Sequence, residues 1–331
     1  MILITGATGF IGSHLVEKLL EGESRISCLV RKKNKLGFLK ELPKQKFKKI
    51  NIIYGDLLDK HSLEKALENI TKVYHLAAIS KPMNIPKHVY YDVNVKGTKN
   101  LLDACKNNKV KKMVLISSMS VFGFSRDGNP LNENSPQLPV SDYGKSKLLE
   151  EKLVLDFCKN NKIKLVVVRP PMVFGPRDLQ FLKLFRLINT GCFPLLKKGR
   201  ARFEFTYVKN LVNGILMADE KGKNLESYNI NDGKTYTIKK VFDTIAELER
   251  KRLFPVSIPV WSVRLAGLFF EKSCALLGKK AIFSSGTALW MSRDNIMDIS
   301  KAKEELGYKN EIPLKESIKE TISWYKKEGL L

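Results

Sequence analysis

The side chains that hold metals or form disulfide bridges are scarce in this sequence. Its 331 residues include five cysteines and four histidines, and the cysteines lie far apart, are odd in number and form no Cys-x-x-Cys pair. This argues against a disulfide framework and predicts a reduced, cytoplasmic compartment. The histidines have no ligand-like spacing with one another or with the cysteines, so no metal is expected. The first residues, an apolar run and a glycine turn, predict no signal peptide.

No apolar run is long enough to cross a membrane. The most apolar stretch covers residues 253–283, where Arg264, Glu271 and Lys272 interrupt it before the roughly 20 apolar residues that a spanning helix needs. A helix there would have one apolar face, which could line a pocket, pack as core or lie on a membrane surface. Pocket lining or core is favoured over peripheral membrane contact. The side chains of this face are Trp261, Leu265, Leu268 and Phe269.

Acidic residues are few compared with basic ones. The chain has 34 aspartates and glutamates against 58 lysines and arginines, which gives a net charge of +24. The densest basic stretch is residues 31–49, with nine basic side chains and one acidic side chain. Such a field attracts phosphates and anionic surfaces. Lysines are also scattered through most helical segments and no nucleic-acid module is recognisable, so we interpret the charge as a solvated surface and expect no nucleic-acid partner.

What is present is a regular alternation of strand and helix patterns. Short, continuously apolar runs such as ILIT, RISCLV and KLVVVRP alternate with helical segments through the first half of the chain. Continuous apolar strands indicate burial on both faces, so the alternation predicts an α/β protein with a doubly wound parallel sheet. After Pro170 the rhythm breaks. We expect residues 1–170 to form the sheet domain and residues 171–331 a smaller cap, with segments near 203–220 returning to the sheet domain.

A glycine-rich stretch, TGATGFIG at residues 5–12, follows the first strand and opens the first helix. Gly6 permits a tight turn, Gly9 lets the backbone approach a pyrophosphate and Gly12 allows close helix packing, while the helix N-terminus offers free N–H groups. Its position at the first strand-to-helix junction favours a dinucleotide site of the Rossmann type over a plain turn.

The end of the second strand distinguishes the two nicotinamide cofactors. An acidic residue there binds the ribose 2′-hydroxyl, whereas a basic residue can bind a 2′-phosphate. The strand RISCLV runs directly into Arg31, Lys32 and Lys33. NADP is therefore expected, with NAD as the alternative. Asp56, which follows the third strand, is an expected adenine contact.

Tyr143 and Lys147 are spaced to share one face of a helix. A phenol ordinarily titrates at about 10, so at neutral pH it needs a neighbouring cation to exchange protons. Lys147, helped by an oxidised nicotinamide, can supply that positive potential. The upstream run KMVLISSMSVFG places serines at a strand end, where a hydroxyl could hold the substrate oxygen that Tyr143 protonates.

Together these residues resemble the extended short-chain dehydrogenase/reductases, which include nucleotide-sugar epimerases and dehydratases, hydroxysteroid dehydrogenases and flavonol-type reductases. The resemblance covers nearly the whole chain, through TGATGFIG, GDL, HLAA, YDVNVKGT, ISSMSVFG, YGKSK, RPPMVFGP and FTYVKNLV. It implies a catalytic trio of Ser118, Tyr143 and Lys147, in which Ser118 is preferred to Ser117. It also implies a homodimer formed by the long helices that include Asn94 and Tyr143.

The resemblance also assigns the surroundings of the trio. Asn94 is expected to shape the helix near the site, although it could simply cap or kink that helix, and Ser120 could simply bond backbone. His75 is expected to pack at a strand end. The residues expected along the cofactor are Gly6, Thr8, Gly9, Phe10, Ile11, Gly12, Arg31, Asp56, Leu57, Leu76, Ala77, Ala78, Asn94, Tyr143, Lys147 and Pro170. The expected substrate pocket consists of Ser80, Ser118, Ser120, Met172, Val173 and Phe174.

The segment RPPMVFGPRD, residues 169–178, bears on the substrate. Nucleotide-sugar members carry a pattern that resembles R-x-F-N-x-x-G, whose asparagine helps to bind the substrate diphosphate. Aligned on Arg169 and Gly175, that position is Met172. A thioether cannot donate a hydrogen bond to a phosphate, and it packs well against apolar ligands. This segment, FEFTYVKNLVNGILMA and IPVW are instead similar to the hydroxysteroid and sterol-carboxylate dehydrogenase branch.

We therefore expect an NAD(P)-dependent oxidoreductase that transfers hydride between the nicotinamide and a secondary alcohol or ketone of a hydrophobic substrate, such as a sterol, terpenoid or long-chain compound. A nucleotide-sugar 4-epimerase or dehydratase is the first alternative, because Met172 could simply fill core while other residues bind a diphosphate. A non-catalytic dinucleotide-binding sensor is the second alternative, and the intact trio argues against it.

Overall fold

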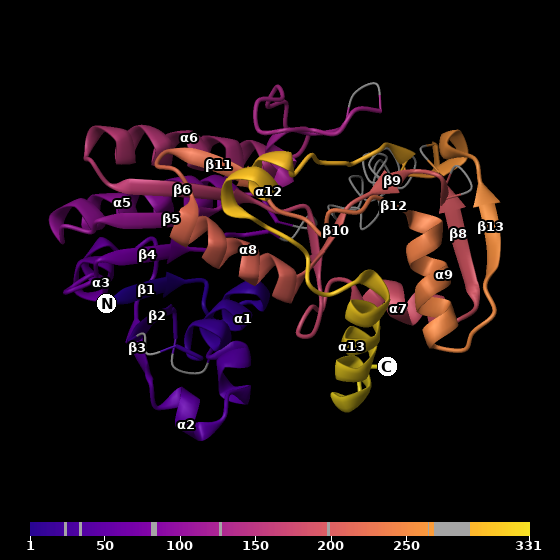
Figure 1. Cartoon of the computed structure of the whole chain (residues 1–331), viewed down its shortest axis with the longest axis horizontal. Coiled ribbons are helices and arrows are strands. Elements are labelled where there is room, and N and C mark those ends of the chain that lie inside the picture. Colours follow the sequence, from indigo (N-terminus) through magenta and orange to yellow (C-terminus); the bar gives the residue numbers. More distant parts are fainter. Residues whose placement is uncertain are drawn as a thin grey trace.

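The computed structural model describes most of the chain. The described residues are 1–22, 25–32, 35–80, 85–125, 128–196, 199–263, 265–267 and 292–331. Leu268 and Phe269, two members of the apolar face expected in the stretch 253–283, lie outside them. Figure 1 shows the two parts of the molecule, a sheet flanked by helices at the left and a smaller group of helices and short strands at the right.

A seven-stranded parallel sheet forms the larger part. Its strand order is β11-β6-β5-β4-β1-β2-β3, so the order of strands reverses between β1 and β4. Every neighbouring pair in it is parallel, as the continuous apolar runs predict, and the expected doubly wound α/β fold is confirmed. The strands are β1 (Ile2–Thr5), β2 (Ile26–Val30), β3 (Ile50–Tyr54), β4 (Lys72–His75), β5 (Lys112–Ile116), β6 (Lys164–Arg169) and β11 (Glu226–Asn229).

Two layers of helices cover the sheet (Figure 1). On one face α1 packs against α8, and α12 packs against α8 and β11. On the other face α5 packs against α3 and α6. Each layer buries its own apolar cluster against the sheet. The helices are α1 (Phe10–Leu19), α3 (Lys60–Ala66), α5 (Thr98–Asn107), α6 (Asp142–Asn160), α8 (Val208–Lys221) and α12 (Ser300–Leu306).

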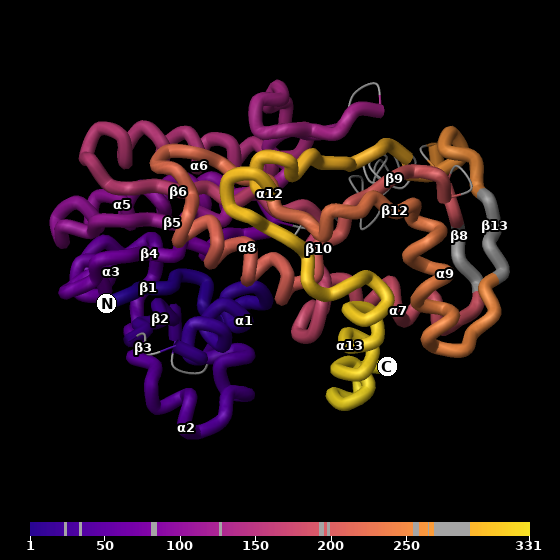
Figure 2. The backbone as a smooth tube through the Cα atoms, viewed as in Figure 1, coloured from indigo at the N-terminus to yellow at the C-terminus, as the bar shows by residue number. Residues whose placement is uncertain are grey.

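The cap is built from chain segments that leave the sheet after β6. Figure 2 shows the path: the chain enters the cap, returns through α8 and β11 to the sheet, and crosses to the cap twice more. A third cluster of aliphatic and aromatic side chains forms the core of the cap. The elements of this region are β7 (Met172–Phe174), α7 (Leu182–Asn189), β8 (Cys192–Leu196), β9 (Arg202–Phe203), β10 (Phe205–Tyr207), β12 (Tyr236–Thr237), α9 (Ile238–Leu248), β13 (Phe254–Ile258) and α13 (Leu314–Lys327).

Most of the short helical elements follow the ends of strands along the chain. The most unusual is a π-helix that continues α4 and leads into α5, because π-helical turns are rare and often occur at functional sites. Among the described helices none is both long and apolar enough to cross a membrane. The short elements are the 3-10 helices η1 (Gly37–Glu41) and η3 (Met119–Val121), the α-helices α2 (Lys44–Phe47) and α4 (Lys87–Tyr90), and the π-helix η2 (Tyr91–Gly97).

A buried ion pair joins β6 to α6. The Arg169 Nε donates to the Glu151 carboxylate at 3.1 Å, and a second nitrogen of the same guanidinium donates to the other carboxylate oxygen. Both side chains are almost fully buried, and the guanidinium lies 5.0 Å from the centre of the Phe122 ring. A bidentate pair of this kind offsets the cost of burying two charges.

We predict that Arg169→Met lowers the free energy of unfolding by about 3–5 kcal/mol, because it leaves the Glu151 carboxylate buried without its partner. Urea unfolding of the variant and the wild type measures the difference. The double variant Arg169→Met/Glu151→Leu should recover part of the loss, because no buried charge remains. Wild-type stability of the single variant would contradict this account of the pair.

Candidate active site

A cleft of about 1150 Å³ opens at the carboxyl edge of the sheet and extends between the sheet domain and the cap. This is where parallel α/β sheets bind their ligands, at the reversal of strand order. Most of the residues predicted from the sequence line it. They are Gly6, Thr8, Gly9, Phe10, Ile11, Gly12, Arg31, Asp56, Leu57, Leu76, Ala77, Ala78, Ser80, Ser118, Ser120, Tyr143, Met172 and Val173.

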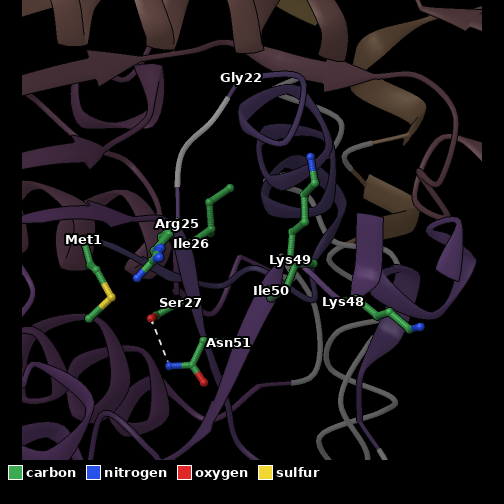
Figure 3. Close-up of a pocket in the computed structure, with 9 residues that line it drawn as sticks. All are labelled: Met1, Gly22, Arg25, Ile26, Ser27, Lys48, Lys49, Ile50 and Asn51. Carbon is green, nitrogen blue, oxygen red and sulfur yellow. Dashed lines mark hydrogen bonds between the residues drawn. The ribbon is translucent and has the colours of Figure 1, made fainter. Parts of the chain in front are cut away.

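A second hollow, of about 690 Å³, lies at the opposite edge, where β1, β2 and β3 begin (Figure 3). Arg25, Lys48 and Lys49 give it a basic lining, and Asn51 donates a hydrogen bond to the Ser27 hydroxyl at 3.3 Å. None of the residues predicted for the cofactor or substrate lies there.

The glycine-rich turn at one end of the cleft fits the phosphates of a dinucleotide. Gly6 has φ +72°, and a Cβ on it would lie 2.7 Å from the Ala77 nitrogen. A Cβ on Gly12 would lie 2.1 Å from the Gly6 oxygen. The turn, the start of α1 and the end of β4 can therefore pack this closely only because side chains are absent. The first N–H groups of α1 then face the cleft, where they can bind phosphate oxygens.

Basic and acidic side chains mark the end of the cleft beside β2 and β3. Arg31 and Lys35 both line it, together with Asp56. Gly37 packs so tightly that a Cβ would lie 2.3 Å from the Thr8 oxygen, which brings this loop against the glycine-rich turn. The sequence predicted Arg31 but did not single out Lys35 from the basic stretch, because the loop closure that places it has no local sequence signal.

Helix α6 begins beside the strand end that carries Ser118. The Ser141 hydroxyl accepts a hydrogen bond from the Gly144 nitrogen and caps the helix. A Cβ on Gly144 would lie 2.5 Å from the Ser120 oxygen, so the helix packs directly on the turn 118–121. This contact brings Tyr143 close enough to Ser118 for the hydroxyl to lower the pKa of the phenol, while the same hydroxyl bonds that of Ser120 at 3.1 Å.

Neighbouring groups shift the pKa of the Tyr143 phenol in opposite directions. Burial raises its pKa above the ordinary value, Lys147 and the hydrogen bond to Ser118 lower it, and Glu150 raises it. The net pKa lies above the ordinary value of a tyrosine. Further positive charge in the cleft would shift the phenol toward the phenolate.

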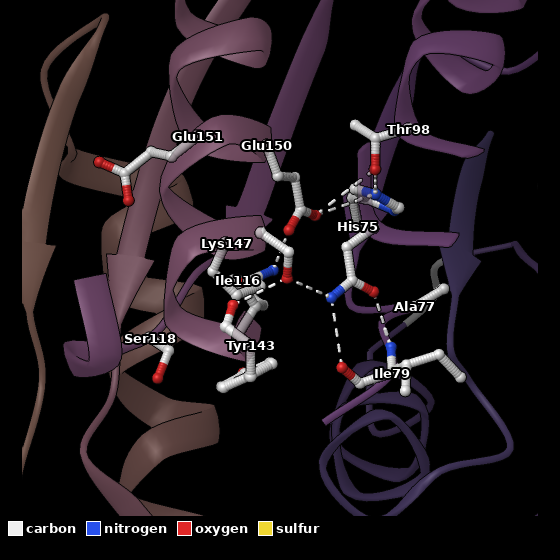
Figure 4. A network of polar contacts seen from close by, with 12 residues as sticks. His75, Ala77, Ile79, Thr98, Ile116, Ser118, Tyr143, Lys147, Glu150 and Glu151 are labelled. Atoms are coloured by element: carbon white, nitrogen blue, oxygen red, sulfur yellow. Dashed lines mark hydrogen bonds and ion pairs between the residues drawn. The ribbon is translucent and has the colours of Figure 1, made fainter. Parts of the chain in front are cut away.

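Lys147 follows Tyr143 by one turn of α6 and does not line the cleft. Its side chain is 2% exposed, and its Nζ donates to the Ile116 oxygen at 2.9 Å. The same nitrogen lies 2.6 Å from a carboxylate oxygen of Glu150 (Figure 4). The positive charge of the ammonium therefore acts on the Tyr143 phenol from the protein interior and not from the cleft.

His75 and Asn94 support the site without lining the cleft. The imidazole of His75 lies between the hydroxyls of Thr5 and Thr98, at 2.7 and 2.8 Å, and burial lowers its pKa to about 3. It is neutral at neutral pH. Asn94, in the π-helix, bonds both backbone groups of Ile79 and donates to the Ser146 hydroxyl at 3.0 Å, so it joins the loop after β4 to α6.

The remaining predicted residues divide between the cleft and the core. Ser80, Ser120, Met172 and Val173 line the cleft. Phe174 does not: it is buried among the aromatic rings of Phe181, Phe205 and Tyr207. Pro170 is also absent from the lining, where Pro171 takes its place. The sequence did not identify several further lining residues, namely Met119, Phe124, Val140, Gln180, Phe181 and Asn295.

The comparisons with known proteins agree with this geometry. A sequence profile of the NAD dependent epimerase/dehydratase family matches residues 2–231. The N-acetyl-alpha-D-glucosaminyl-diphospho-ditrans,octacis-undecaprenol 4-epimerase of Escherichia coli O157:H7 is 30% identical, over 86% of this chain and 83% of that protein. The sterol-4-alpha-carboxylate 3-dehydrogenase of Bos taurus is 33% identical, over 66% of this chain and 59% of that protein. The solved structure of a Bacillus cereus UDP-glucuronic acid 4-epimerase in complex with NAD has a TM-score of 0.78 at 26% identity and covers 99% of both chains.

A Rossmann sheet with a glycine cradle and a Ser-Tyr-Lys site at its edge defines an enzyme that uses a nicotinamide dinucleotide. The chain belongs to the NAD-dependent epimerase/dehydratase family of extended short-chain dehydrogenase/reductases. The epimerase from Escherichia coli matches more of the chain than the sterol dehydrogenase does.

We predict that Gly12→Ala weakens binding of NAD and NADP by about tenfold or more, because the new methyl group collides with the turn that cradles the phosphates. Isothermal titration of the purified protein measures it. Gly22→Ala is the control at the other end of α1, where a Cβ meets its nearest atom at 3.7 Å and binding should be unchanged. Equal affinities of Gly12→Ala and wild type would contradict the cradle.

Proposed function

We propose that the protein transfers hydride between a nicotinamide dinucleotide and a secondary alcohol or ketone, with Tyr143 as proton donor and acceptor. The observation that carries this proposal is the meeting of Tyr143 and Ser118 at the cleft wall, with the Lys147 ammonium behind them. The Tyr143 phenol and the Ser118 hydroxyl both line the cleft, and the buried Lys147 ammonium lies close to the phenol. This arrangement is suited to proton transfer at a carbinol oxygen.

Each residue then has a defined task. The nicotinamide, when bound, supplies the ring carbon that accepts or returns hydride. Ser118 holds the substrate oxygen by a hydrogen bond. Tyr143 removes the hydroxyl proton in the oxidative direction and returns it in the reductive direction, and Lys147 stabilises the phenolate. The glycine turn and Ser118 hold cofactor and substrate side by side, which reduces the entropic cost of reaction.

The lining of the cleft favours a hydrophobic substrate. The lining residues from segments 118–124, 140–143 and 171–181 include Met119, Phe124, Met172 and Phe181. Their charged members are two acids, Asp142 and Asp178, with no lysine or arginine. A diphosphate placed against these residues would find no lysine or arginine among them, and the nearby Arg293 guanidinium stacks on the Phe124 ring at 5.3 Å. The ring or chain of an apolar alcohol would bury apolar surface there.

A second candidate is a 4-epimerase acting on a diphosphate-linked sugar. The match to the Escherichia coli epimerase over 86% of this chain favours it. The name of that relative joins a diphospho-sugar to a polyprenol, so an apolar cleft and epimerase chemistry are compatible. An epimerase returns hydride to its own intermediate and keeps its cofactor, whereas a dehydrogenase exchanges it.

Thermal shifts with sterols, long-chain ketones, nucleotide sugars and a polyprenyl-diphospho-sugar distinguish these candidates. Stabilisation by sterols or ketones supports the dehydrogenase. Stabilisation by nucleotide sugars alone, with dinucleotide retained through purification, would replace it with the epimerase.

We also propose that the cofactor is NADP. Arg31 and Lys35 line the cleft together at the end of β2, where the ribose 2′ position of the dinucleotide would lie. NAD is the alternative, because the Bacillus cereus relative was solved with NAD.

We predict that Tyr143→Phe lowers turnover about a hundredfold to ten-thousandfold, because the proton donor is lost. Dinucleotide affinity should remain close to wild type. Steady-state kinetics and isothermal titration measure the two effects. Tyr236→Phe is the control, because it removes a hydroxyl in the cap that does not line the cleft. Near-normal turnover of Tyr143→Phe would refute the assignment.

We predict that Arg31→Gln/Lys35→Gln weakens NADP binding by about tenfold or more and leaves NAD binding nearly unchanged, because charged hydrogen bonds to a 2′-phosphate are lost. Isothermal titration with both dinucleotides tests this. A parallel fall in both affinities would mean that these residues do not read the 2′ position.

A further inference from the structure

Glu150 is a buried carboxylate for which the reaction proposed above has no role. It lies on α6, three residues after Lys147, and its side chain is 1% exposed. One carboxylate oxygen lies 2.6 Å from the Lys147 Nζ. The other lies 3.4 Å from the His75 Nε2 and 3.5 Å from the Thr98 hydroxyl, which donates to it. Figure 4 shows the carboxylate between the lysine and the imidazole.

The ionic partner of this carboxylate is Lys147. His75 is neutral at neutral pH, because burial and the nearby Lys147 lower its pKa to about 3. Glu151, the next residue on the helix, points away from Glu150 in Figure 4 and pairs with Arg169. The charge of Glu150 therefore acts chiefly on the lysine that lies behind the reactive phenol.

A buried carboxylate is costly unless it is paired, and Lys147 is the ionic partner of Glu150. The free-energy cost of removing a charge from water is offset only when the charge is paired and hydrogen-bonded. The feature that needs an explanation is therefore the effect of Glu150 on Lys147.

We propose that Glu150 is a positioning residue of the active site, which offsets the charge of Lys147 and so sets how readily Tyr143 gives up its proton. This inference rests on the proposed function, in which Tyr143 exchanges a proton with the substrate. Lys147 stabilises the phenolate, and Glu150 opposes that effect from the far side of the ammonium.

Tyr143 and Glu150 compete for the same positive charge. When Tyr143 loses its proton, a second negative charge acts on the buried cluster, and the affinity of Glu150 for a proton increases by linkage. Burial already raises the pKa of Glu150 to about 7, against the opposing effect of Lys147. A proton taken up by Glu150 as the phenol releases one would keep the charge of the cluster constant.

The phenol titration tests this proposal directly. The ultraviolet difference absorbance between a protein and its Tyr143→Phe counterpart isolates the ionisation of Tyr143. We expect the midpoint to fall by about one pH unit or more in Glu150→Gln, measured with oxidised NADP bound, because Lys147 is no longer offset. Glu150→Met should give the same shift, and Glu150→Asp, which keeps the charge, should stay near wild type.

Asp156→Asn is the matched control. It removes one negative charge from the same helix at an exposed position, where water and salt screen it, so the Tyr143 midpoint should not move. An unchanged midpoint in folded Glu150→Gln or Glu150→Met would overturn the proposal. An equal shift in Asp156→Asn would also overturn it, because the effect would then be general. The titration needs no turnover, so inactivity toward every substrate would count against the proposed function alone.

Discussion

The buried Lys147 ammonium is the charge around which the candidate site is arranged. It is held between the Ile116 oxygen at the end of β5 and the Glu150 carboxylate on its own helix. A cation removed from water needs such partners, and the bond to the Ile116 oxygen also joins α6 to the sheet. Because Tyr143 lies one turn before Lys147 on the same helix, this docking also places the phenol beside Ser118. The hydrogen bond that stabilises the buried Lys147 ammonium thus also helps to orient the Tyr143 phenol.

The features with a local sequence pattern could be predicted, and those that depend on remote packing could not. Continuous apolar runs indicated the parallel strands, and the spacing of Gly6 and Gly12 indicated the cradle. Phe174 was expected in the pocket, but rings from later segments of the chain enclose it. Asn295 was not expected there, because it reaches the cleft through backbone pairing with Arg202, far away in sequence.

The turn at residues 175–178 joins the cap to α1. The ring of His14, on α1, is 2.9 Å from the Pro176 oxygen. The Arg177 guanidinium lies 3.0 Å from the Glu17 carboxylate and 3.5 Å from the Glu41 carboxylate, on α1 and η1. The cleft walls formed by α1 and by the cap therefore share one junction. If α1 holds the dinucleotide and the cap holds the substrate, as proposed, this junction helps to set their relative position, which hydride transfer requires.

A single-turnover absorbance measurement tests whether hydride is transferred at this site. The wild-type protein is loaded with oxidised NADP or NAD and mixed with secondary alcohols of the sterol, long-chain and diphospho-sugar classes. We expect reduced nicotinamide to form with at least one apolar secondary alcohol. Dinucleotide that binds tightly but is never reduced by any of these alcohols would contradict hydride transfer at this site.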